Sequence, residues 1–155
     1  YQYELQNIGS NNIDDTINST NYLRLSMPWD QDRKILNNDV LIQKSILREL
    51  LEYVAKQKIP VQIHALGNRA IQYHRDIISN IVDYGPWINI IDKSFNIHVL
   101  ESSLVSTRVS EYVIGDNRRY SFEFFNEEGR HLMGLAQLNG NYNFDDLVNE
   151  LGVFS

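Results

Sequence analysis

Two histidines are the side chains of this sequence best suited to bind a ligand. His64 lies within Val61–Leu66, and His98 lies within Phe95–Val99. In both stretches apolar and polar residues alternate, which predicts strands that bury the apolar side chains and turn the histidine to the opposite face. On like faces of neighbouring strands, two neutral imidazoles share a pocket and can bind a metal ion or a haem iron. The alternative is that each is an ordinary hydrogen-bonded residue of a sheet.

Arginines and two further histidines complete the groups of chemical interest. A guanidinium can bind the carboxylates of an acidic ligand, although such arginines more often cover a sheet face in solvent. We expect His74 and His131 to be exposed to solvent, because His74 lies at a predicted strand end and His131 follows a predicted turn. The arginines in or beside predicted strands are Arg69, Arg108, Arg118 and Arg119.

Several classes of site are absent from the sequence. The 155 residues contain no cysteine, which excludes disulfides, thiolate metal sites and cysteine nucleophiles. There is no His-x-x-x-His pair and no Gly-x-Ser-x-Gly motif, and neither a phosphate-binding loop nor a dinucleotide fingerprint is present. The sequence therefore argues against zinc hydrolases, serine hydrolases of that type and nucleotide-binding enzymes.

The overall charge is acidic. Twenty acidic and fourteen basic side chains give a formal net charge of −6, which does not suit a surface that binds phosphates, so we expect no nucleic-acid partner. No apolar run approaches the roughly 18 residues that a membrane span requires, and the N-terminus lacks the layout of a signal peptide. We therefore expect a soluble protein without a membrane partner, and the absence of cysteine agrees with a cytoplasmic location.

One helix is predicted in the first half of the chain. Residues 1–39 are rich in Asn, Asp and Ser, and we expect them to be largely irregular. Apolar residues then recur at helical spacing at Ile42, Ile46, Leu50 and Val54. Asp39 is a suitable N-cap and Pro60 ends the pattern, which predicts a helix over 40–58.

The remainder of the chain has the character of a sheet. Turn-forming residues divide 61–138 into short alternating stretches, and strands joined by such short turns pair antiparallel. Residues 144–151 are predicted to form a short closing helix. We therefore expect a single α+β domain over 1–155, built on a large antiparallel sheet in meander order with flanking helices.

Four segments stand in an order and spacing found in one known family. They are Val61–His64, Gly67–Tyr73, Gly85–His98 and Ser121–Arg130. Within roughly residues 40–138, the chain resembles the bacterial haem-utilisation family of the HemS, ChuX and HutX type. The N-terminal residues 1–39 match the family poorly.

The resemblance implies a function and a set of site residues. Members of this family bind haem in the cytoplasm, carry it and in some cases degrade it, and the single-domain forms dimerise. By resemblance, His64 and His98 are the candidate haem ligands. Arg69 and Arg108 are then the candidates for contacts with the haem propionates.

We therefore expect a cytoplasmic protein that binds haem and either sequesters it or passes it to a partner protein, and that forms a homodimer. One alternative is a haem-degrading enzyme that uses an external reductant. The other is an interaction domain that keeps the fold without binding haem. A carrier is favoured over an enzyme, because nothing in the sequence supplies electrons.

Overall fold

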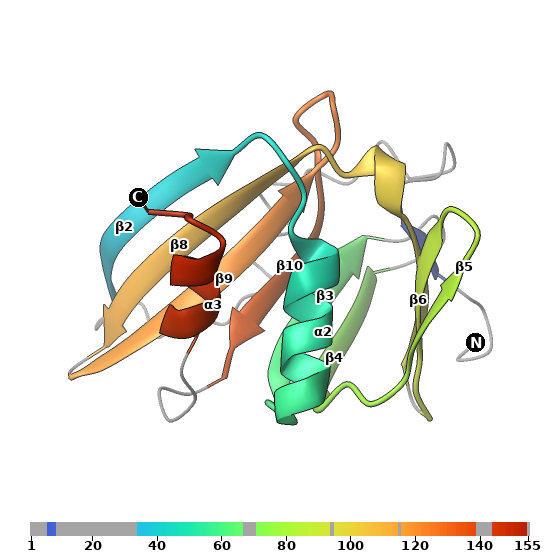
Figure 1. Cartoon of the computed structure of the whole chain (residues 1–155), viewed down its shortest axis with the longest axis horizontal. Coiled ribbons are helices and arrows are strands. Elements are labelled where there is room, and N and C mark those ends of the chain that lie inside the picture. Colours follow the sequence, from blue (N-terminus) through green and yellow to red (C-terminus); the bar gives the residue numbers. More distant parts are fainter. Residues whose placement is uncertain are drawn as a thin grey trace.

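In the computed structural model, the strands form two sheets and helices pack against them (Figure 1). The structure describes residues 6–8, 34–66, 71–93, 95–114, 116–138 and 144–154. Statements about the fold and the site refer to these residues.

The larger sheet has six strands in the order β2-β8-β9-β10-β3-β4, and every neighbouring pair is antiparallel. Its strands are β2 (Lys34–Ile42), β3 (Val61–Leu66), β4 (Ile71–Asp76), β8 (Ser106–Ile114), β9 (Asn117–Phe125) and β10 (His131–Gln137).

The smaller sheet has four strands in the order β1-β7-β6-β5. Its strands are β1 (Gln6–Ile8), β5 (Ile81–Tyr84), β6 (Trp87–Ile91) and β7 (Asn96–Leu100). The pairs are antiparallel except that β1 runs parallel to β7. Gly85 takes a φ of 58°, which glycine adopts without steric cost, and this allows a two-residue turn to pair Tyr84 with Trp87.

The predicted α+β class with mostly antiparallel strands is confirmed. The meander order holds within β5-β6-β7 and within β8-β9-β10, but the strands divide into two sheets and β10 pairs with β3. This pairing places Leu135 opposite Ile63 and Met133 opposite Ala65, so that apolar side chains far apart in sequence are buried together. Short turns determine only which consecutive strands pair, so they did not predict this arrangement.

The predicted helix over 40–58 is wrong at its beginning. Helix α2 spans Leu47–Gln57, and the residues before it form β2. Asp39 is therefore not an N-cap but lies opposite Ser110 in the β2-β8 pair. Ladder pairing along β8 outweighed the helical spacing of a few apolar residues, because local propensity is a weak preference that tertiary contacts override. The helix ends as expected before Pro60, with Lys58 in a left-handed conformation.

Helix α2 provides the centre of the hydrophobic core. Its buried face consists of Leu47, Leu50, Leu51 and Val54. These side chains belong to one core cluster with Ile63 and Phe122 of the larger sheet and with Ile90 of the smaller sheet. The core therefore holds the two sheets together through the helix.

Two short elements complete the described fold. A 3-10 turn, η1 (Glu101–Ser103), connects β7 to β8, and helix α3 (Asp145–Glu150) lies within the range expected for the closing helix. Among the described residues, no helix is long and apolar enough to cross a membrane.

Candidate functional site

The two central strands of the smaller sheet, β6 and β7, bury one of their two faces. Alternate side chains of these strands point into the core, namely Ile88, Ile90, Ile97 and Val99. Because side chains alternate along a strand, the residues between them lie on the opposite face, which we call the outer face. His98 of β7 and Asn89 of β6 are on this face and are cross-strand partners. The orientation predicted for His98 is therefore confirmed.

His98 is held by the neighbouring amide. Its Nδ1 is hydrogen-bonded to Oδ1 of Asn89, and Asn89 Nδ2 donates to the carbonyl oxygen of Val82 at 2.9 Å. The other ring nitrogen, Nε2, is buried and has no hydrogen-bond partner among the described residues. Burial lowers the pKa of His98 below its ordinary value of 6.5, which favours the neutral imidazole.

Asn89 was missed by sequence reasoning, although a signal for it existed. The β6-β7 hairpin pairs Ile91 with Asn96, and counting outward from that pair places Asn89 opposite His98. The short turn after Ile91 therefore contains the information that places Asn89 beside His98.

His64 is also buried, in a different setting. Its Nε2 lies 2.8 Å from Nε2 of Gln62, and its ring is 4.7 Å from that of Tyr73, centroid to centroid. The Tyr73 hydroxyl donates to Oε1 of Gln62 at 3.2 Å. Burial lowers the pKa of His64 to about 4, so this ring is neutral at pH 7. An amide nitrogen only donates, so Nε2 of His64 must accept, and its lone pair is already engaged.

The two histidines do not lie on neighbouring strands. His64 belongs to β3 of the six-stranded sheet, whereas His98 belongs to β7 of the four-stranded sheet. The interpretation that they share a pocket by strand pairing is therefore wrong, since the chain forms two sheets rather than one. In the part of the chain that the structure describes, no group of three or more His, Asp or Glu side chains is placed to hold a metal ion.

Of the two candidate arginines, only Arg108 lies within the described residues. Arg69 lies outside the described residues. Arg108 is half-exposed on β8, with its Nε 3.7 Å from Oδ1 of Asp39 and with Glu123 as its cross-strand partner. Burial raises the pKa of Glu123 to about 7, and the charge of Arg108 partly opposes this rise. Arg108 thus lies among carboxyl groups that compete with any acidic ligand.

His74 and His131 are buried, contrary to the expectation that they are exposed. His74 stacks on Phe95 with ring centroids 4.6 Å apart. His131 begins β10 beside a register shift and packs edge-on against Phe125. Burial and the neighbouring His64 lower the pKa of His131 to about 3.

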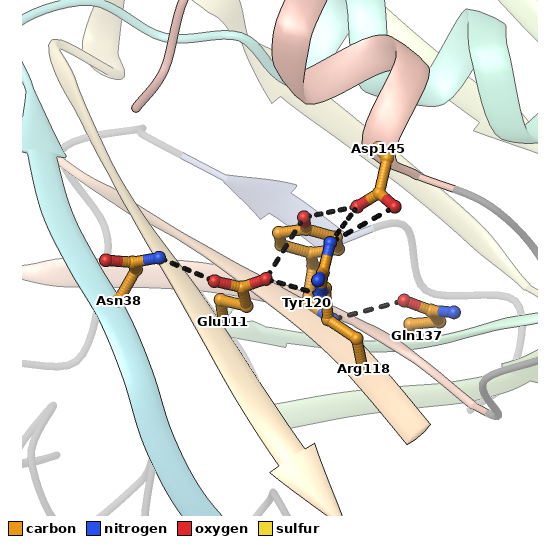
Figure 2. A network of polar contacts seen from close by, with 6 residues as sticks. All are labelled: Asn38, Glu111, Arg118, Tyr120, Gln137 and Asp145. Atoms are coloured by element: carbon orange, nitrogen blue, oxygen red, sulfur yellow. Dashed lines mark hydrogen bonds and ion pairs between the residues drawn. The ribbon is translucent and has the colours of Figure 1, made fainter. Parts of the chain in front are cut away.

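A second polar cluster connects helix α3 to the larger sheet (Figure 2). Glu111 is buried and accepts from Nδ2 of Asn38 at 2.6 Å, and Nε of Arg118 lies 2.8 Å from its other oxygen. The Tyr120 hydroxyl donates to Oδ1 of Asp145 at 2.5 Å. Burial, followed by the bond to Asp145, raises the pKa of Tyr120. Since these groups satisfy one another, we interpret the cluster as structural.

This interpretation predicts the effect of removing one hydroxyl. Tyr120→Phe should lower the free energy of unfolding by about 1–2 kcal/mol, because it leaves carboxylate oxygens near α3 with one donor fewer. Urea unfolding followed by circular dichroism measures the difference. Tyr84→Phe is the matched control, because Tyr84 is 77% exposed and a surface change should stay within about 0.5 kcal/mol. Equal effects of the two changes would contradict a stabilising role of the cluster.

Comparison with known proteins gives a family match over most of the chain. The model of the haemin-degrading HemS.ChuX domain matches residues 36–149. The hemin transport protein HemS of Yersinia enterocolitica is 25% identical over 120 residues, which cover 76% of this chain and 34% of that protein. The chain therefore spans about a third of the length of this relative.

Solved structures show the same fold. Holo-PhuS, a haem-binding protein from Pseudomonas aeruginosa, superimposes with a TM-score of 0.55 at 23% identity, covering 82% of this chain and 35% of that one. The haem-degrading enzyme ChuS of Escherichia coli O157:H7 gives a TM-score of 0.57 at 19% identity, covering 88% and 39% respectively. At these identities the likeness establishes the fold alone.

Proposed function

Because the chain belongs to the haemin-degrading HemS.ChuX domain family, we propose that it binds haem, with His98 as the ligand of the iron. The observation that carries this proposal is the Nε2 atom of His98, which is buried and lacks a hydrogen-bond partner among the described residues. A neutral imidazole with an available lone pair is the usual protein ligand of haem iron. The lone pair of His98 Nε2 is therefore suited to bind haem iron.

The surroundings of His98 on the outer face fit a flat apolar ligand. In the register of the sheet, the row His98-Asn89-Val82 has the row Leu100-Trp87-Tyr84 on one side and the pair Asn96-Ile91 on the other. Tyr84 is 77% exposed and Ile91 is 42% exposed. A group of exposed apolar side chains on one face is typical of a binding surface, whereas single exposed apolar residues are common anywhere. A porphyrin ring would cover them, and the groups that bury Nε2 of His98 would move aside for the iron to reach the imidazole.

The proposed role is to sequester or transfer haem in the cytoplasm. Binding and release need only a residue that binds the iron and an apolar surface for the porphyrin, and we propose His98 and the outer face for these two roles. The names of the similar proteins include a transport protein, a haem-binding protein and a degrading enzyme, so they support haem utilisation without choosing among these roles. Propionate binding by Arg69 and Arg108, a transfer partner and a homodimer stay predictions.

A haemin titration tests the proposal. We expect a saturable Soret band with one haemin bound per chain, and no such band would contradict haem binding and favour an interaction domain instead. Adding ascorbate or a reductase to the complex then separates the roles. A carrier keeps its Soret band, whereas an enzyme loses it and releases iron and a linear tetrapyrrole. Loss of the band with release of these products would overturn the carrier role.

A further inference from the structure

We propose that Asn89 is a positioning residue that fixes the proton of His98 on Nδ1 and so leaves Nε2 as the unprotonated, ligand-ready nitrogen. Asn89 lies on β6 directly opposite His98 and is 3% exposed. The consequence for haem rests on the proposed function, but the state of the His98 ring can be measured without haem.

The orientation of the Asn89 amide follows from its second partner. Its Nδ2 donates to the carbonyl oxygen of Val82 at 2.9 Å. Turning the amide around would place Oδ1 against that carbonyl, so that two acceptors faced each other and a buried donor lost its partner. Oδ1 is therefore the atom that faces His98, as the hydrogen bond between Asn89 and the ring shows.

The orientation of the amide determines the tautomer of the ring. An amide oxygen can only accept, so Nδ1 of His98 must carry the hydrogen of this bond. A neutral imidazole has a single ring proton, which leaves Nε2 with its lone pair free. A metal-binding histidine usually donates a hydrogen bond from the ring nitrogen that does not bind the metal. This bond selects the tautomer of the ring and increases its basicity.

His64 shows the opposite arrangement, which supports a specific role for Asn89. There the amide nitrogen of Gln62, not an amide oxygen, meets the ring, and it meets Nε2 rather than Nδ1. The lone pair of Nε2 is used in that bond. His64 and His98 thus each have an amide partner, but only the partner of His98 leaves Nε2 available.

The ring proton can be located directly in the protein without haem. In ¹⁵N-labelled protein, long-range ¹H–¹⁵N spectra should show His98 with Nδ1 protonated and Nε2 unprotonated. Asn89→Leu removes the acceptor, so the proton should distribute between the two nitrogens. A proton on Nε2 in the wild-type protein, or an unchanged His98 signal in Asn89→Leu, would overturn the inference.

Haemin binding supplies a second readout. We expect Asn89→Leu to weaken haemin affinity by about 10–100-fold, as for other outer partners of metal ligands. Asn89→Asp keeps an acceptor for Nδ1 but loses the donor to the Val82 carbonyl oxygen, so it should weaken affinity less than Asn89→Leu does, and its carboxylate should shift the ferric–ferrous midpoint potential to more negative values. Circular dichroism checks that both variants fold, and Asn89→Ala, which removes the acceptor without adding bulk, takes the place of Asn89→Leu if that variant does not fold.

Asn96→Leu is the matched control. Asn96 lies on the outer face of β7 two residues before His98, and its Oδ1 has no hydrogen-bond partner among the described residues. This change should leave the His98 tautomer and the midpoint potential unaltered, and an effect equal to that of Asn89→Leu would contradict the inference.

If His98→Ala abolishes haemin binding and Asn89→Leu does not weaken it, the positioning role fails and the proposed function stands. If the wild-type protein binds no haemin, the proposed function fails and the ring spectra alone decide the inference.

Discussion

Replacing His98 by alanine is expected to weaken ferric haemin binding by more than about 100-fold, since removing the ligand must cost more than removing its outer hydrogen-bond partner. The Soret band of any residual complex should also move, because the iron would lose its imidazole. A spectroscopic haemin titration measures both effects. His98 lies on the outer face of the smaller sheet, so the change should leave the buried core intact, and thermal unfolding checks this.

His64→Ala is the informative companion to this variant. The Nε2 atom of His64 accepts from Gln62, so His64 would have to give up this bond before it could bind iron. We therefore expect His64→Ala to change the Soret maximum and the affinity far less than His98→Ala does. Equal losses in the two variants would show that both histidines reach the iron. A loss confined to His64→Ala would reject His98 as the ligand.

Mild acid is expected to destabilise the protein through its buried histidines. Burial lowers the pKa of His64 from 6.5 to about 4 and that of His131 to about 3. In the unfolded chain both rings take up a proton near pH 6.5. The stability that the neutral rings contribute is therefore complete above pH 6.5. It is lost as the pH falls from 6.5 through the pKa values of the two rings in the folded protein. Near pH 5.5 each such ring gives a slope of about 1.4 kcal/mol per pH unit.

Glu123 has the opposite effect on the pH dependence of stability, because its contribution increases as the pH falls. Burial raises its pKa from 4.5 to about 7, so the folded protein holds a proton there that the unfolded chain releases. Its contribution is complete below pH 4.5 and is lost as the pH rises through 7. The two histidines together outweigh this single carboxyl between pH 4.5 and 6.5. The net result is a protein that loses stability in mild acid.

Two variants separate these contributions. The free energy of unfolding, measured in urea at several pH values, should depend less on pH in His131→Leu, by about 1.4 kcal/mol per pH unit between pH 5 and 6. In Glu123→Gln the dependence should be steeper by about the same amount. The slope is the informative quantity, because it does not depend on how much either change destabilises the fold at pH 7. An unchanged slope in His131→Leu would show that His131 is protonated in the folded state.

The alternating pattern of the sequence predicted the strands around both histidines correctly. Ile97 and Val99 are fully buried, and His98 lies on the other face, as the alternation around it indicated. Short turns likewise predicted the antiparallel pairs β5-β6 and β8-β9. These features depend on neighbours a few residues apart, so a single sequence contains the information that determines them.

The helix boundary and the burial of His131 could not be predicted in the same way. The predicted helix included residues 40–42, because Ile42 lies at helical spacing from the apolar residues that follow it. These residues instead pair with Thr107–Val109 of β8, more than sixty residues later in the chain. His131 follows a turn and yet is 2% exposed, because β9 and β3 flank β10 on either side. In both cases the deciding contacts join distant segments, which local propensity does not report.

The sequence by itself determined the chemical inventory of this protein: histidines without thiols, a net acidic charge, strands of alternating polarity and the segments that resemble a haem-utilisation family. Only the tertiary structure decided what each imidazole can do. It divided the strands into two sheets, gave His64 an amide donor that engages its Nε2 and gave His98 an amide acceptor that leaves Nε2 available. Whether a lone pair is free depends on which hydrogen-bonding atom faces it, and that atom comes into place only when the strands pair in register.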